Sequence, residues 1–207
     1  MVNEIIKKVV NIPFVWNTGQ RIVGANPWKV LIYPSVFDTK GKILDFGCSI
    51  GNSTEAFLDF EYYGVDIDAG AIEAARKRWR RYPNVHFEAL DILAQPFKVD
   101  FFDHVLFACT AHHLTDEQLA PTLDVLLKFL KHGGQLHFFD VIRRPGKDRF
   151  TTRLIMQNDQ GKNMRTKTEY EAIFCGGEYL VTETRMFPSP DRWIKLQDMV
   201  YFRLMRS

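Results

Sequence analysis

The chain has 207 residues, of which 46% are hydrophobic and 25% charged, and its formal net charge is +2. This composition is typical of a globular protein, and a charge this small does not by itself indicate a nucleic-acid or membrane partner. The three cysteines, an odd number without C-x-x-C spacing, argue against a disulfide framework and against a zinc site. Residues 1–10 do not resemble a signal peptide and no stretch approaches the ~18 apolar residues of a membrane span, so we expect a cytoplasmic protein.

The elements predicted along the chain alternate between strands and helices. Residues 1–40 contain prolines and aromatic residues without a strand pattern, and we expect them to form an N-terminal cap of helical segments. Residues 41–207 are expected to form one domain, with strands at 43–46, 62–65, 85–88, 104–108 and 135–142, and helices at 52–60, 69–81 and 116–131. This alternation predicts an α/β fold with a Rossmann-like, doubly wound sheet.

The last third of the chain interrupts this alternation. Residues 143–165 contain seven basic and two acidic residues, and we expect them to form part of a lid over an anionic acceptor. A helix at 167–174 follows, and strands at 179–187 and 199–205 are expected to form an antiparallel pair. The predicted sheet therefore has about seven strands, mostly parallel, with a C-terminal antiparallel strand.

The most informative stretch is a small-residue turn directly after the first predicted strand. The strand ends at Asp45, and Gly47, Ser49 and Gly51 follow it; a second strand ends at Asp66, 21 positions after Asp45. A glycine-rich turn of this kind, followed by an acid about 20 residues later, is typical of nucleoside-cofactor sites in open α/β sheets. Asp45 would repel the phosphates of a dinucleotide, whereas the ammonium and sulfonium groups of S-adenosylmethionine favour a nearby carboxylate. The pattern therefore favours S-adenosylmethionine as the cofactor.

In this turn and in five later segments, the chain resembles the class I S-adenosylmethionine-dependent methyltransferases, in particular small stand-alone bacterial ones. Ser49 replaces the middle glycine of the family's first motif. The later segments are GVDID at 64–68, ALDI at 89–92, FDHVL at 102–106, AHHL at 111–114 and LKHGG at 130–134. The resemblance covers about residues 40 to 142. It implies a methyltransferase that moves the cofactor's methyl group to a small-molecule acceptor and releases S-adenosylhomocysteine.

The resemblance also implies roles for the cofactor-binding residues. Asp45 is expected to hold the methionine amino group, directly or through water, and its alternative role is to cap the next helix. Asp66 is expected to accept hydrogen bonds from both ribose hydroxyls, with Asp68 as the fallback. Ile67 and Ile92 would enclose the adenine or else belong to the core, and Asp91 would lie near the adenine amino group or be a turn acid. The residues expected to bind the cofactor are Asp45, Gly47, Ser49, Gly51, Asp66, Ile67, Asp91 and Ile92.

Two histidines are the candidates for a catalytic base. His112 and His113 follow the fourth predicted strand, at the sheet edge where open α/β sheets bind ligands. Imidazole is the usual general base near neutral pH, and His112 matches the family position, so it is the first choice; the alternative for the pair is structural hydrogen bonding. No H-E-x-x-H pattern is present, and no metal site is expected.

Residues 158–166 resemble a second motif, D-R-G-x-x-V-R-T, found in some small bacterial methyltransferases. Asp159, Gly161, Arg165 and Thr166 match it. Arg165 could clamp a carboxylate or phosphate of the acceptor, and its alternative role is a salt bridge that ties down the loop.

Three other functions remain open. The stretch 47–51 also fits the G-x-S-x-G nucleophile elbow of α/β-hydrolases, with Ser49 as nucleophile, but the last histidine, His137, comes too early for the usual triad order. An RNA methyltransferase is the main alternative, based on basic stretches such as 76–81, although these better fit a solvated helix end. The third is a domain that binds the cofactor without transferring methyl. Without a target-recognition module, a small-molecule acceptor is favoured over nucleic acid.

Overall fold

The computed structural model describes residues 25–92, 94, 97–159, 161–177, 179–189 and 197–206. The expected N-terminal cap at 1–40 falls partly outside these residues. Its described part contains the helix α3 (Ala25–Ile32) and a 3₁₀ turn at Pro34–Val36.

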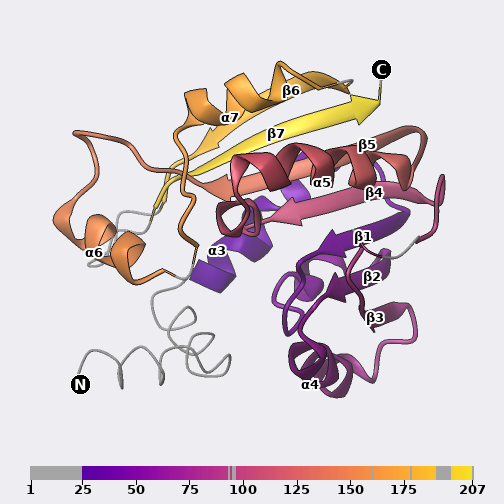
Figure 1. Ribbon diagram of the computed structural model, residues 1–207. Coiled ribbons are helices and arrows are strands. Elements are labelled where there is room, and N and C mark those ends of the chain that lie inside the picture. Colours follow the sequence, from indigo (N-terminus) through magenta and orange to yellow (C-terminus); the bar gives the residue numbers. More distant parts are fainter. Residues whose placement is uncertain are drawn as a thin grey trace.

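A seven-stranded sheet with the order β3-β2-β1-β4-β5-β7-β6 forms the centre of the molecule (Figure 1). Strand β7 is antiparallel to both β5 and β6, whereas the other strand pairs are parallel. The strands are β1 (Lys42–Phe46), β2 (Glu61–Asp66), β3 (Val85–Ala89), β4 (Phe102–Ala108), β5 (Leu130–Val141), β6 (Tyr179–Phe187) and β7 (Met199–Arg206). The expected Rossmann-like sheet with a C-terminal antiparallel strand is confirmed.

Helices cover both faces of the sheet because successive strand residues point to opposite sides. On one face, Leu44 of β1 belongs to a buried cluster with residues of α5 (Asp116–Lys128) and α7 (Lys167–Phe174). On the other face, Ile43 packs in a second cluster with α3 and α4 (Ala69–Trp79). In Figure 1, α5 lies in front of the sheet and α3 behind it. The sheet is therefore doubly wound, with helices packed on both of its faces.

Two expected helices differ from the structure. The expected helix at 52–60 is wrong: a 3₁₀ turn at Thr54–Phe57 takes its place. In this segment Phe57 and Phe60 both contact Phe37, with ring centroids 5.0 and 5.7 Å away. Beyond the end of the 3₁₀ turn, the Phe60 N–H donates to the Phe57 carbonyl at 3.0 Å, and this i to i+3 bond brings the two side chains to the same side.

The expected helix at 116–131 ends earlier, at Lys128, and β5 begins at Leu130 instead of residue 135. Leu130 pairs with Phe102 of β4, and a register shift follows before the regular pairing from Gln135 onward. The glycine pair at 133–134 therefore lies inside an irregular strand and does not terminate a helix. The basic segment 143–165 also contains a helix that was not expected, α6 (Phe150–Asn158).

Candidate active site

The turn after β1 has a backbone that favours glycine at two of its positions. Gly47 and Gly51 have φ angles of 75° and 72°, and Ser49 between them has a φ of 50°. A Cβ atom at Gly47 would lie 2.5 Å from the Thr110 hydroxyl, so the turn also packs closely against the end of β4. Ser49 adopts a conformation that costs a residue with a Cβ roughly 1–2 kcal/mol. The turn therefore keeps the left-handed geometry of the motif even where the glycine is replaced.

Asp66 joins the turn after β1 to the end of β2. Its Oδ2 accepts a hydrogen bond from the Ser49 N–H at 2.8 Å, and its Oδ1 accepts from the Asp68 N–H at 2.9 Å. Asp68 instead begins α4: its Oδ1 accepts from the N–H groups of Gly70 and Ala71, at 2.8 and 3.0 Å. The structure therefore separates the two acids, with Asp66 at the turn and Asp68 as a helix cap.

Asp45 is a buried carboxyl, 2% exposed, and the Tyr62 hydroxyl donates a hydrogen bond to its Oδ2. Burial raises the pKa of Asp45 to about 7; the bond from Tyr62 lowers it and the charge of Asp66 raises it. Among the described residues, no cationic side chain forms an ion pair with Asp45. A buried carboxyl that has no cationic partner among the described residues, beside a glycine-rich turn, fits the ammonium group of S-adenosylmethionine. The ammonium group would supply a positive charge next to the carboxylate.

The residues expected near the adenine differ in exposure. Ile67, directly after β2, is 78% exposed, whereas Ile92 is 3% exposed and belongs to the core cluster on the α5 face. Asp91 is exposed. The geometry supports the core alternative for Ile92 and leaves the apolar surface of Ile67 available at the sheet edge.

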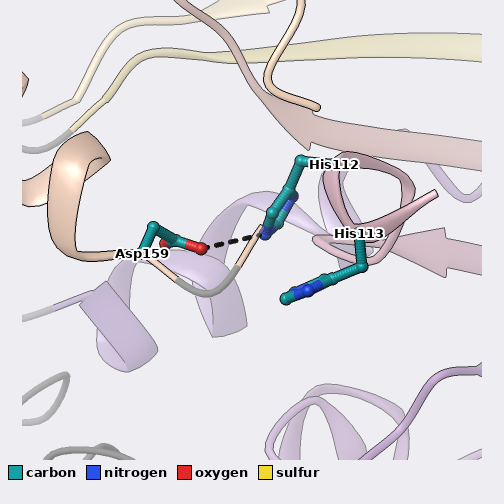
Figure 2. Close-up of side chains that lie close together, drawn as sticks. All are labelled: His112, His113 and Asp159. Carbon is teal, nitrogen blue, oxygen red and sulfur yellow. Dashed lines mark ion pairs between the residues drawn. The ribbon is translucent and has the colours of Figure 1, made fainter. Parts of the chain in front are cut away.

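His112 is held from inside the sheet by Asp140, a fully buried residue of β5. Its Nδ1 lies 2.6 Å from Asp140 Oδ1, and the Tyr170 hydroxyl donates to Asp140 Oδ2 at 2.6 Å. Burial alone would raise the pKa of Asp140, but the charge and hydrogen bond of His112 and the bond from Tyr170 lower it. An ionised carboxylate only accepts hydrogen bonds, so the proton of neutral His112 lies on Nδ1 and its lone pair on Nε2. Nε2 faces Asp159 Oδ1 at 3.6 Å (Figure 2).

The two histidines lie side by side and differ in environment. Their ring centroids are 4.4 Å apart; His112 is 4% exposed and His113 is exposed. Burial lowers the pKa of His112, but the charges of Asp140 and Asp159 outweigh burial and the pKa is raised. The pKa of His113 is lowered by burial and by the His112 charge, although the fields of Asp159, Asp140 and Asp66 oppose this shift.

Two matching residues of the second motif, Asp159 and Gly161, lie against the His112 ring. The Asp159 carboxylate accepts from the Gly161 N–H at 2.8 Å, and the backbone of Gly161 lies so close to the His112 ring that a Cβ there would be 1.9 Å from its Cδ2. The Asn163 N–H donates to the His112 carbonyl at 2.9 Å. Thr166 accepts from the Glu169 N–H and so caps α7. The motif thus builds a loop against the candidate base.

Arg165 is 5% exposed, and its guanidinium is occupied within the protein. It donates to the carbonyls of Ala111, Asn163 and Leu114 at 3.1, 3.0 and 2.8 Å, and it forms an ion pair with Asp116 at 2.6 Å. These contacts support the alternative role of Arg165, which is to tie the loop to the end of β4.

Sequence reasoning missed Asp140 and Tyr170 and assigned no site role to Asp159. A signal for Asp140 was present, because it is an acid within the apolar run at 138–142, where the interior strand β5 ends. An acid in such a run is buried, and a buried acid needs partners. No helix among the described residues has the length and apolar character needed to cross a membrane.

Comparisons with known proteins agree with this geometry. Residues 43–134 match a family model described as a methyltransferase domain. The chain is 35% identical over 117 residues to a lovastatin diketide synthase of Aspergillus terreus, covering 50% of this chain and 4% of that protein. It is 28% identical over 112 residues to an uncharacterized methyltransferase of Anoxybacillus flavithermus, covering 53% of this chain and 51% of that protein. The chain therefore spans only a part of the length of these relatives.

Among solved structures, the mitomycin 7-O-methyltransferase MmcR superposes with a TM-score of 0.73 at 15% identity, covering 95% of this chain and 59% of that one. At this level of identity the likeness shows the fold alone. The fold is nevertheless the one expected from the resemblance, and the matched family covers the cofactor turn, Asp66 and both histidines.

Proposed function

We propose that this chain, a class I S-adenosylmethionine-dependent methyltransferase by its matched domain and its fold, transfers a methyl group to a small-molecule acceptor. One observation carries the proposal. The buried Asp45 and the turn-bound Asp66 flank the left-handed turn after β1, and the His112–Asp140 pair lies at the neighbouring end of β4. An anchoring site for the cofactor and a candidate base thus share one edge of the sheet.

The cofactor side fits the chemistry of S-adenosylmethionine, which supplies a methyl group on a sulfonium and leaves as S-adenosylhomocysteine. Asp45 would hold the ammonium group, and Asp66 would accept from the ribose hydroxyls while keeping its two backbone hydrogen bonds. Ile67 would cover one face of the adenine. The remaining residues that we propose for this side are Gly47, Ser49, Gly51 and Asp91, whereas Ile92 belongs to the core.

On the acceptor side, His112 would take the proton that the acceptor loses as the methyl group arrives. Its Nε2 carries the lone pair because Asp140 fixes the proton on Nδ1. A positioned base contributes roughly 100- to 10,000-fold to the rate when the acceptor needs deprotonation. His113, which is more exposed, is the second candidate.

The acceptor is proposed to be anionic. The basic segment 143–165 begins at the carboxyl end of β5, two residues after the Val141 that ends this strand. A cavity of about 540 Å³ is lined there by Arg143, Arg144, Lys147 and Lys167, with Asp198 as its acidic member. Glu169 and Asp198 pair with Arg143 and Arg144, so an anion would bind in competition with these partners.

Two rival functions receive less support. RNA binding would depend on the basic run at 76–81. One of its members, Arg76, instead donates from Nη2 to the Phe87 carbonyl at 2.8 Å. A hydrolase would need Ser49 as nucleophile, but the matched family covers this turn as part of a methyltransferase domain.

Calorimetry with purified protein tests the cofactor. S-adenosylmethionine or S-adenosylhomocysteine should bind and NAD should not. Incubation with methyl-labelled cofactor and a panel of carboxylates, phosphates, neutral metabolites and RNA then tests the transfer. Binding of NAD with neither adenosyl compound would reject the proposed function, and label found only on RNA would reject the acceptor class.

A further inference from the structure

Three potential metal-ligating side chains converge at the ends of β4 and α6. His112 and His113 come from the 3₁₀ turn Ala111–His113 that follows β4, and Asp159 follows α6 (Figure 2). One ligand atom from each of the three lies within 4.8 Å of the others. The group therefore combines two segments that are far apart in sequence.

The separation between His112 Nε2 and Asp159 Oδ1 is informative. At 3.6 Å it is too long for a hydrogen bond. Zinc lies about 2.0–2.2 Å from imidazole nitrogen and carboxylate oxygen, which sets tetrahedral ligand atoms roughly 3.4 Å apart. The two atoms are thus spaced as ligands that share one cation.

We propose that His112 Nε2, the His113 imidazole and the Asp159 carboxylate bind one divalent first-row transition-metal ion. Two imidazoles and one carboxylate suit zinc, cobalt or iron(II) and disfavour calcium or magnesium. Three protein ligands also leave at least one coordination position for water or another small ligand.

Outer contacts already orient two of the ligands. Asp140 accepts from His112 Nδ1 at 2.6 Å, which fixes the tautomer that offers Nε2 to a metal. The Gly161 N–H donates to Asp159 Oδ1 at 2.8 Å and holds the carboxylate toward the histidines. Such outer partners are a regular feature of metal sites, and their loss typically costs 10- to 100-fold in metal affinity.

Metal binding by these three side chains does not depend on methyl transfer. A metal ion and a proton compete for the same lone pair of His112, so a bound ion would remove the proposed base. Added Zn²⁺ should therefore suppress any transfer that uses this base, and a chelator should restore it. Metal binding itself is measured without cofactor or acceptor, so failure of one proposal is distinguishable from failure of the other.

The test is a titration of the chelator-treated protein with Co²⁺, followed by visible absorption, and with Zn²⁺, followed by calorimetry. We expect one ion per chain, with the absorption of a site of four or five ligands. His113→Ala and Asp159→Asn should each weaken the dissociation constant at least tenfold. His132→Ala is the matched control, because His132 is an exposed histidine at the start of β5, away from the site, and binding should be unchanged.

Asp140→Asn separates metal binding at this site from binding elsewhere on the surface. Asp140 is not a proposed ligand, yet the variant should weaken metal binding 10- to 100-fold because it no longer fixes the His112 tautomer. Circular dichroism of each variant shows that it folds. The proposal is overturned if neither ion binds, if both ligand variants bind as tightly as the original chain, or if only the His132 variant loses binding.

Discussion

Asp140 holds His112 from the interior of the sheet, with 2.6 Å between Asp140 Oδ1 and His112 Nδ1. The carboxylate is fully buried and accepts further hydrogen bonds from Tyr170 and from the Val141 N–H. Because both Asp140 oxygens are engaged, the imidazole has one orientation and one tautomer. The orientation of the candidate base is thus set by a strand residue behind it.

Asp140→Asn should lower kcat at least tenfold once an acceptor is known, because the amide carries no charge to stabilise the imidazolium. Cofactor affinity should stay within twofold, since the change lies away from the turn after β1. Tyr170→Phe is the matched control: it removes one hydrogen bond to a charged group, worth roughly 1.5–3 kcal/mol of stability, and leaves His112 in contact with Asp140. Steady-state kinetics and urea unfolding measure both variants. Equal kcat in Asp140→Asn and the original chain would remove Asp140 from the mechanism.

Asp66 and Asp68 form a second matched pair. Asp66→Ala should weaken S-adenosylhomocysteine binding at least tenfold, because it removes the acceptor proposed for the ribose and frees the Ser49 N–H. Asp68→Ala should cost about 0.5–2 kcal/mol of stability through the lost cap of α4, with little effect on cofactor affinity. Calorimetry and urea unfolding separate the two effects. The reverse pattern would exchange the roles of the two acids.

Asp45 predicts a loss of stability at higher pH. Its pKa is about 7 in the folded protein against an ordinary value of 3.8, so the folded state binds this proton more tightly. The stability that protonated Asp45 contributes is fully present below about pH 4 and is lost as the pH rises through about 7. Each unit of difference between the folded and unfolded pKa corresponds to roughly 1.4 kcal/mol. Relative to the original chain, Asp45→Asn should therefore raise the unfolding free energy of the cofactor-free protein more at pH 8 than at pH 5. It should also weaken cofactor binding.

Urea unfolding at the two pH values measures this change, with the exposed Asp124→Asn of α5 as control. If the pH dependence of stability is the same in Asp45→Asn and the original chain, the buried carboxyl does not cause it.

His137 predicts the opposite behaviour in acid. It is fully buried, its Nε2 lies 3.2 Å from His104 Nδ1, and its Nδ1 lies 3.0 Å from the Tyr201 hydroxyl. Burial lowers the pKa of both histidines, and the charge of Arg203 acts in the same direction, although the charge of Asp103 opposes the shift at His104. Both therefore favour the neutral form in the folded protein. Their contribution to stability is present above about pH 6.5 and is lost as the pH falls.

His137→Gln should flatten this acid dependence, whereas the exposed His132→Gln should leave it unchanged. Unfolding free energies between pH 5 and 7.5 provide the measurement. A steeper acid loss in His137→Gln would contradict the neutral pair.

Ser49→Gly tests the turn and the hydrolase alternative together. Glycine relieves the left-handed strain of roughly 1–2 kcal/mol but loses more conformational freedom on folding, so stability should change by less than about 1 kcal/mol. Cofactor affinity should be kept or improved. A hydrolase would lose its nucleophile, and labelling of Ser49 by a fluorophosphonate probe would favour that class instead.

The elements predicted best from the sequence are those determined by residues that lie close together in the chain. Helix α7 was expected at its observed bounds, and the structure shows that a capping box of Thr166 and Glu169 forms its start. The turn after β1 was also predictable, since its glycines directly follow the strand in one short motif. The 3₁₀ turn at Thr54–Phe57 was not, because short apolar spacings do not distinguish it from an α-helix.

The partners of His112 could not be assigned for a different reason. Asp140 lies 28 residues from His112 in sequence, and the two meet only because β5 pairs with β4. Asp159 reaches His112 from a separate loop. Pattern analysis identified Asp159 and Gly161 as motif residues but gave no indication of which side chain they face.

The tether formed by Arg165 has a consequence for motion. Its guanidinium joins the carbonyls of Ala111 and Leu114 on one segment to the Asn163 carbonyl on the other, and the Asn163 N–H bonds to His112. These links join the histidine turn to the loop at 161–166 through both side-chain and backbone hydrogen bonds. An acceptor that reaches His112 would therefore meet a turn and a loop that are already joined, and separating them would break these hydrogen bonds.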